Sequence, residues 1–177
     1  MYKSRILKKT GQKLRSRKGA VSLIETVVTL LLVVLMSGMM VTGIRLAVKV
    51  YTTVVDKANA QVLLTTTEKI LRNELSSAKK ITVQDDKKAV SYQNNVTGQK
   101  YTLSSPDADI LKTKDGKTEK NRLIAETTGT KNLHINFEAI ELSDDKRYIT
   151  VSGLTVTKGT QTLAGPEDYL IGVQKPN

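Results

Sequence analysis

One carboxylate stands at the edge of a long uncharged segment near the start of this chain. Glu25 is followed by nineteen residues, 26–44, that include no Asp, Glu, Lys or Arg. A helix of this length covers about 28 Å, close to the thickness of the hydrocarbon core of a bilayer. A carboxylate in that position is costly unless it meets a cation or a hydrogen-bond donor. The sequence therefore predicts a membrane-spanning helix with a functional acidic residue at its front edge.

The residues before Glu25 are strongly basic. Met1 to Lys18 contain eight Lys and Arg residues and no Asp or Glu. Because an excess of Lys and Arg keeps a flanking segment on the cytoplasmic side, we expect the rest of the chain to be delivered outward. The sequence predicts a single-pass protein of the cell membrane, with a short cytoplasmic N-terminus and an extracytoplasmic C-terminal domain.

The junction between the basic segment and the apolar run resembles the type III signal of prepilins and pseudopilins. In that family a basic leader ends in a small residue, and the mature chain reaches a Glu at its fifth position before a long apolar helix. The motif Ser22-Leu23-Ile24-Glu25 matches this pattern. Cleavage after Gly19, the usual residue of the family, would make Glu25 the sixth mature residue. Cleavage after Ala20 makes it the fifth and Val21 the first, and we favour this site.

The resemblance implies a function in assembly. A prepilin peptidase would remove residues 1–20, and the new N-terminus would be methylated. This amine would meet Glu25 of a neighbouring subunit as the helices enter a filament on the inner-membrane assembly platform. The partners implied are other pilin or pseudopilin subunits, in a cell-surface type IV pilus or in a secretion or competence pseudopilus. The stretch 70–75 with Ala78 is similar to J-type minor pseudopilins, so we favour a minor subunit.

The apolar run is predicted to be the first part of one long helix. No Gly or Pro occurs between Gly43 and Gly98. Beyond the run, apolar residues recur at spacings of three and four, which places them along one helical face. They are Ile44, Val48, Tyr51, Val55, Ala58 and Val62, followed by Leu64, Leu71, Leu75 and Ala78. We expect a transmembrane helix over 21–45 and an amphipathic continuation over 46–80.

Two charge patterns support the second half of this helix. Glu68 and Arg72 lie four residues apart, a spacing at which opposite charges stabilise a helix. Lys79 and Lys80 stand where cations complement a helix C-terminus, so we expect the helix to run to about Lys79.

Residues 81–177 are predicted to form a β-rich extracytoplasmic domain, because the apolar period changes to two. The expected strands are 89–93 and 100–104 around a turn at 94–98, 109–113 and 122–126 around Asp115-Gly116, 133–139, 147–157 with a bulge at Gly153, and 169–173. An antiparallel sheet of this kind would cover the apolar face of the second half of the helix. The predicted class is α+β, the architecture that the pilin resemblance also implies.

Composition argues against several other functions. There is no Cys, so disulfides, thiol catalysis and Cys-based metal sites are excluded, and a single His, His134, cannot form a multi-His zinc site. The net charge of +11 comes mostly from the leader, so we do not expect nucleic acid as a direct partner. No Ser/His/Asp or paired-carboxylate constellation stands out, and we expect neither an enzyme nor a cofactor.

Two short motifs have ordinary explanations. Asp107 and Asp109, with Asp115-Gly116 beyond, hint at a calcium loop, but Leu111 stands where a further oxygen ligand is needed, and we predict no metal. Asn95-Val96-Thr97 fits an N-glycosylation sequon, which hairpin chemistry also explains.

An alternative interpretation has the same membrane topology but no cleavage of the N-terminal segment. The basic segment and the apolar run would form an uncleaved signal anchor that tethers a binding domain for DNA or an envelope component. This alternative leaves Glu25 without a role.

Overall fold

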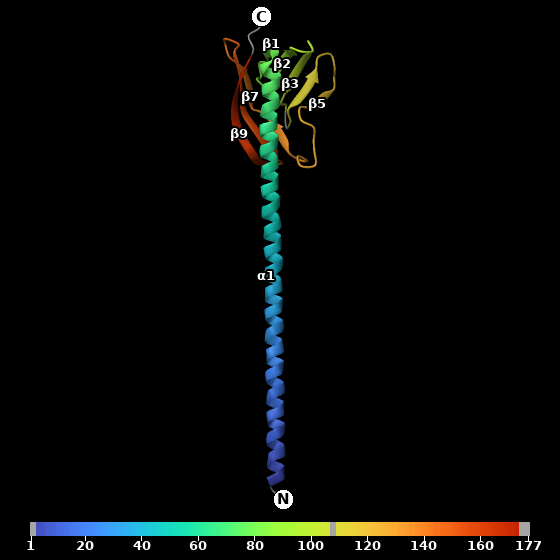
Figure 1. The fold of residues 1–177 in the computed structure, drawn as a ribbon, viewed down its shortest axis with the longest axis vertical. Coiled ribbons are helices and arrows are strands. Elements are labelled where there is room, and N and C mark those ends of the chain that lie inside the picture. The colour runs from blue at the N-terminus through green and yellow to red at the C-terminus, as the bar shows by residue number, and fades with distance from the viewer. Residues whose placement is uncertain (1–2, 107–108, 174–177) are drawn as a thin grey trace. The chain divides into compact units, whose positions relative to one another are not determined.

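The computed structural model describes residues 3–106 and 109–173, with side chains described from Ser22 onward. Within these ranges the chain forms one helix, α1 (Lys3–Ser76), followed by strands β1 to β9 (Figure 1). The strands are β1 (Ala78–Val83), β2 (Ala89–Asn94), β3 (Lys100–Ser104), β4 (Leu111–Lys114), β5 (Lys120–Arg122), β6 (His134–Asn136), β7 (Ala139–Leu142), β8 (Tyr148–Lys158) and β9 (Gln161–Gly172). A helix packed on antiparallel sheets makes this an α+β protein, as predicted.

The chain divides into two compact units, Met1–Thr52 and Thr53–Asn177. The described part of the first unit is helical throughout and belongs to α1. Its hydroxyl groups bond back to helix carbonyls: Thr26 to that of Ser22 at 2.9 Å and Ser37 to that of Val33 at 2.7 Å. These bonds satisfy the polar side chains of an otherwise apolar segment.

The apolar side chains of this first unit are exposed. From Leu23 to Val50 the large apolar side chains keep 50–72% of their surface accessible. With a mean hydropathy of 2.4 in its most apolar window, α1 is long and apolar enough to cross a membrane. This property is consistent with a single-pass membrane anchor.

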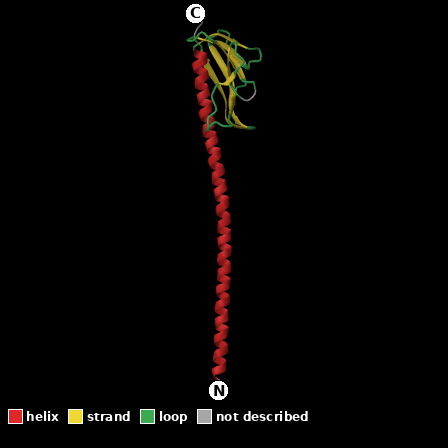
Figure 2. Ribbon diagram, turned by 90° about the vertical axis from the view of Figure 1, so that its right-hand side faces the viewer, coloured by secondary structure: helices red, strands yellow, loops and turns green. Residues whose placement is uncertain are grey.

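The second unit joins the last part of α1 to two antiparallel sheets. One sheet has five strands in the order β1-β2-β3-β4-β5. In the other, β8 pairs with β6 and β7 along one edge and with β9 along the other. Figure 1 shows β7 and β9 to one side of α1 and β3 and β5 to the other, and Figure 2 shows all strands on the same face of the helix.

The core lies between this face of α1 and the two sheets. From the helix it takes Leu64, Leu71 and Leu75, which are at most 2% exposed. From the sheets it takes chiefly Val90, Leu103, Ile140, Ile149, Val151, Leu154 and Val156. Leu64, Leu71 and Leu75 are therefore packed as predicted, whereas Ala78 is buried from β1 and does not belong to the helix.

The first part of the predicted stripe, from Ile44 to Val62, is not packed in this structure. Val62 is 63% exposed, and Val55 and Ala58 are also exposed, whereas Ala60 and Leu64 are buried. The reason is helix geometry. Each residue advances by about 100°, so Val62 and Leu64 lie about 200° apart and face opposite directions. The two sets that the spacing joined into one stripe belong to opposite faces of α1.

The helix also ends earlier than predicted. It stops at Ser76, and Lys79 and Lys80 belong to β1, so they do not form the expected basic last turn. Ala78, which is 2% exposed, enters the core and is paired with Asn94 of β2. Burial of Ala78 and the pairing of β1 with β2 thus stabilise these residues more than another turn of helix would.

The strand pattern is predicted in part: β1 was expected to be helical in its first residues, and β9 begins at Gln161, eight residues before the expected last strand. The hairpin of β2 and β3 has the expected bounds within one residue, and the hairpin around Asp115-Gly116 is shorter than expected. The single strand expected over 133–139 is instead two strands, β6 and β7, separated at Phe137 and Glu138. The bulge at Gly153 is confirmed, since the register of β8 against β9 shifts between Val151 and Leu154 and Gly153 has a φ of 66°.

Candidate functional site

The predicted processing residues lie in the helix. Gly19, Ala20 and Val21 all fall within α1, and their side chains are outside the described residues. Glu25 lies four residues further on and is the first acidic residue of the chain. Its side chain is exposed.

Glu25 shares one face of α1 with small hydroxyl side chains. Ser22, Thr26 and Thr29 line a shallow open groove with it, at helical spacings of three and four residues. The Thr29 hydroxyl donates to the Glu25 carbonyl oxygen at 2.7 Å. Among the described side chains no cation pairs with the Glu25 carboxylate.

An exposed apolar stripe follows on the same helix. We call Val55, Ala58 and Val62 the outer stripe, because none of them contributes to the core of the second unit, to which they belong. Val62 is 63% exposed and Val55 36%. The spacing of these residues was visible in the sequence, and their angular offset from Leu64 was the signal that they face away from the sheets.

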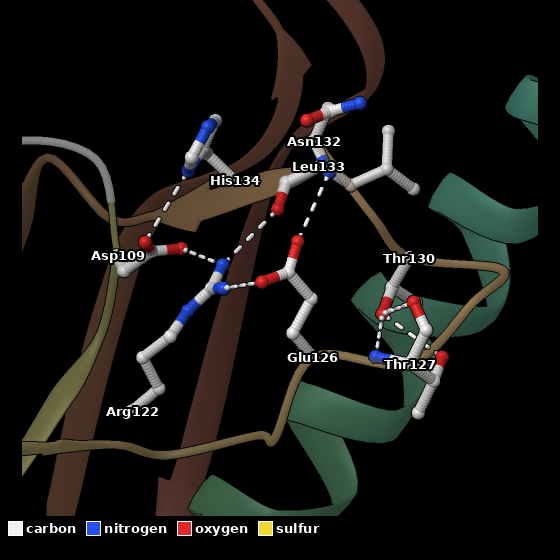
Figure 3. Close-up of polar contacts among 8 residues, drawn as sticks. All are labelled: Asp109, Arg122, Glu126, Thr127, Thr130, Asn132, Leu133 and His134. Atoms are coloured by element: carbon white, nitrogen blue, oxygen red, sulfur yellow. Dashed lines mark hydrogen bonds and ion pairs between the residues drawn. The ribbon is translucent and has the colours of Figure 1, made fainter.

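A cluster of charged side chains joins the two sheets (Figure 3). The Arg122 guanidinium donates to the Asp109 carboxylate at 2.7 Å and to the Leu133 carbonyl oxygen at 3.2 Å. It also lies 3.4 Å from the Glu126 carboxylate, and the other Asp109 oxygen lies 3.2 Å from Nδ1 of His134. Arg122 belongs to β5 of one sheet, and His134 begins β6 of the other.

This cluster has a stabilising arrangement. The side chains of Asp109 and Arg122 are 19% and 31% exposed, and the arginine fork neutralises one carboxylate while it bonds a backbone carbonyl. His134 is 39% exposed, and its ring is directed at Asp109. The turn at Asp115-Gly116 was the only sequence signal that Asp109 and Arg122 lie close together. The turn predicts a hairpin, and the β4–β5 register of that hairpin makes the two residues near neighbours.

The residues considered for metal binding lie apart from such a site. Asp107 lies outside the described residues, Asp109 is engaged by Arg122 and His134, and Asp115 is exposed in the β4–β5 turn. Within the described ranges no group of three or more His, Cys, Asp or Glu side chains is placed to hold a metal ion.

A second polar cluster ties the helix to the five-stranded sheet. Glu74 of α1 accepts a hydrogen bond from the Tyr92 hydroxyl at 2.7 Å and forms an ion pair with Lys112 at 2.6 Å. Lys112 also lies 4.4 Å from the centre of the Tyr101 ring. Burial of Tyr92, together with its hydrogen bond to Glu74, raises the pKa of its phenol well above the ordinary value. The predicted pair of Glu68 and Arg72 is also present, at 2.8 Å.

The two polar clusters of the sheet domain differ from Glu25 and the outer stripe in having their partners within the described residues. The clusters around Arg122 and Glu74 satisfy their own charges, whereas Glu25 and the outer stripe have no counterpart in the described residues. Comparisons with protein-family models, with curated proteins and with solved structures find no match to this chain.

Proposed function

We propose that this chain is a pilin-like subunit, processed by a prepilin peptidase and assembled through its N-terminal helix into a filament. The filament is a type IV pilus or a secretion or competence pseudopilus, and the subunit is a minor one. The observation that carries the proposal is Glu25, a carboxylate with no cationic partner among the described residues, at the edge of a helix fit to cross a membrane.

Glu25 acts in this proposal by pairing with an amine. Cleavage after Ala20 creates a new α-amino group on Val21, four residues before Glu25 in the same chain. In an assembled bundle the amine of one subunit neutralises Glu25 of its neighbour, and the low dielectric of the bundle makes the pair strong. Unpaired, the same charge in an apolar surrounding is unfavourable, so the pair fixes the axial position of each helix.

The outer stripe supports the same assembly. An exposed apolar face on a helix that already has a packed opposite face indicates a contact with another molecule. In the proposed filament the outer stripe lies against neighbouring helices, while the sheets face outward. Packing is the whole mechanism, and the chain carries out no reaction of its own.

The test is substitution of Glu25 by Ala in the native host. We expect Glu25→Ala to be processed normally and retained in the membrane, yet to be absent from filaments recovered by shearing. Thr29→Val is the matched control, because it changes one hydroxyl on the same face of the helix and leaves the carboxylate. Normal recovery of Glu25→Ala in sheared filaments would rule out the role assigned to Glu25.

The mass of the mature protein tests the processing step separately. A chain that begins at Ala20 or Val21 and carries a methylated amine supports the proposal. A chain with Met1 intact supports the uncleaved anchor.

A further inference from the structure

The face of the five-stranded sheet that points away from α1 carries a polar hollow of about 350 Å³. We call this cavity the Lys80 hollow. Its lining includes hydroxyl, amide and ammonium groups from β1, β2 and β3. The side chains that matter here are those of Lys80, Thr82, Ser91, Gln93, Lys100 and Thr102, with the Asp115 carboxylate also at the hollow.

Strand register shows why these groups share a face. Thr82 pairs with Ser91 and Ser91 with Thr102, so one row of hydroxyls crosses three strands. Gln93 pairs with Lys100, and each lies two residues from a member of the hydroxyl row. Ser91 and Thr102 are hydrogen bonded to one another at 3.0 Å.

The alternate residues point to the helix. The Tyr92 hydroxyl bonds Glu74 of α1, and Val90 and Leu103 are fully buried in the core. The Tyr101 ring is engaged by Lys112, which itself pairs with Glu74. Tyr92 and Tyr101 both line the hollow, but Tyr92 is only 1% exposed and Lys112 covers one face of the Tyr101 ring, so stacking on a ligand would be restricted.

Lys80 is held in an unusual conformation at this hollow. Its φ is 51°, and it sits where the register of β1 against β2 shifts between Lys79 and Thr82. A bulge re-aims a side chain, and a non-glycine residue in the left-handed region is a strained feature that concentrates at functional sites. Lys80 also lines a second hollow of about 220 Å³, together with Lys79 and Lys146.

The ammonium groups around these hollows have no acidic partners. None of the ion pairs formed by the described residues includes Lys79, Lys80, Lys100 or Lys146. From Ala78 to Arg122 the sequence holds ten Lys and Arg residues against six Asp and Glu. This half of the sheet domain therefore presents positive charge beside a row of neutral hydrogen-bonding groups.

We propose that the Lys80 hollow binds an acidic glycan, a sugar polymer that bears carboxylate or phosphate groups. Hydroxyl and amide side chains exchange hydrogen bonds with sugar hydroxyls, and Lys80 and Lys100 pair with the anionic groups. A single-stranded nucleic acid is a poorer fit, because its recognition depends on stacking of bases on aromatic rings. The assignment does not rest on the proposed filament function and would hold for any membrane-anchored form of the chain.

Binding to immobilised polygalacturonate tests the assignment, with the full-length chain in nonionic detergent. Dextran serves as the neutral sugar polymer, poly(glycerol phosphate) as the phosphate-bearing one, and single-stranded DNA as the nucleic acid. We expect polygalacturonate or poly(glycerol phosphate) to bind, dextran to bind weakly, and the bound polymer to be released by salt. DNA that binds as tightly as the better acidic polymer would overturn the assignment, as would a lack of binding to both acidic polymers.

Lys80→Gly is the decisive variant, since Gly suits a positive φ and removes only the side chain. We expect it to weaken binding about tenfold, the loss of one charge-assisted hydrogen bond. Lys87→Gly is the matched control, because Lys87 has a φ of 56° in the β1–β2 turn and lines neither hollow. Equal affinity of the two variants would contradict the proposal, whereas selective loss in Lys80→Gly supports it.

Discussion

Glu74 of α1 and Tyr92 of β2 are joined by a hydrogen bond of 2.7 Å, and the other oxygen of Glu74 lies 2.6 Å from Lys112 of β4. One carboxylate thus links the helix to two strands of the five-stranded sheet. Its side chain is only 22% exposed, so the surrounding solvent screens these interactions weakly. Apolar contacts hold the helix on the sheets, and this carboxylate fixes its position along them.

Replacement of Glu74 by Gln should therefore destabilise the sheet-bearing unit. We expect Glu74→Gln to lower the free energy of unfolding by about 1–3 kcal/mol, because Lys112 would lose its counter-charge in a partly buried place. Urea unfolding followed by tyrosine near-ultraviolet circular dichroism measures the change. Glu68→Gln is the control: its partner Arg72 is 49% exposed, and the expected loss is below about 0.5 kcal/mol. Equal losses of unfolding free energy in the two variants would show that the Glu74 cluster stabilises the fold no more than the exposed pair of Glu68 and Arg72.

Stability should also fall in alkali because of Tyr92. Burial first, and then the hydrogen bond to Glu74, raise the pKa of Tyr92 above its ordinary value of 10.0. The unfolded chain loses this proton near pH 10.0 while the folded chain keeps it, so the free energy of unfolding decreases as the pH rises above that value.

The Tyr92→Phe variant isolates this contribution. Its urea midpoint should be lower than that of the wild type at neutral pH, and it should decline less between pH about 8 and about 11. Some decline will remain, since burial and a hydrogen bond to Glu167 also raise the pKa of Tyr169. An alkaline slope in Tyr92→Phe as steep as that of the wild type would refute the assignment to Tyr92.

Arg122 should contribute more to the free energy of unfolding than an arginine in an exposed ion pair. Arg122→Ala leaves Asp109 without its guanidinium and the Leu133 carbonyl without a donor, so we expect a loss of about 2–4 kcal/mol in unfolding free energy. Arg147→Ala is the comparison, because Arg147 lies 3.7 Å from Asp145 and both side chains are more than half exposed. Its loss should stay below about 1 kcal/mol by the same urea titration. A reversed order of the two losses would count against the role of Arg122 in joining the sheets.

A charge in the middle of the apolar run should weaken membrane insertion. Leu35 lies near the centre of residues 26–44, where a lysine costs about 3 kcal/mol of insertion free energy. We expect Leu35→Lys to leave less protein in the membrane fraction after carbonate extraction. Tyr51→Lys, which places the same charge beyond the apolar run, should extract like the wild type. Full retention of Leu35→Lys would argue against a spanning segment at these residues.

Much of the fold follows from local patterns. The hairpin of β2 and β3 is predictable because polar turn residues interrupt two alternating runs, and Asn94 then bonds the backbone NH groups of Val96 and Thr97. The packed helical stripe of Leu64, Leu71 and Leu75 is predictable for the same reason, since its residues keep one angular position on the helix.

Other features depend on partners that no local pattern reports. The apolar alternation through Ile135 and Phe137 continues across the break between β6 and β7, because both side chains are buried although the backbone changes its pairing. The break faces Gly153 of β8, where a Cβ atom would lie 2.6 Å from Cγ of Glu138. A strand pattern tells which side chains are buried, whereas the bulge of a neighbouring strand decides where the ladder is interrupted.

The candidate sites also differ in whether the local sequence reveals them. Glu25 is conspicuous in the sequence because it is a single charge beside an uncharged run. The cluster of Asp109, Arg122 and His134 joins residues up to twenty-five positions apart, and only the strand register brings them together. The Lys80 hollow depends on a bulge and on three aligned strands, so it has no signature in the residue order.

The order of the strands has a consequence for how the chain acquires its structure. Each sheet is made from one continuous stretch, with β1 to β5 in sequence and β6 to β9 after them. Contacts between residues close in the chain form quickly, because little entropy is lost in closing short loops. During synthesis each sheet can therefore be completed as its own segment emerges, and no early strand has to wait, with its edge open to aggregation, for a partner made much later.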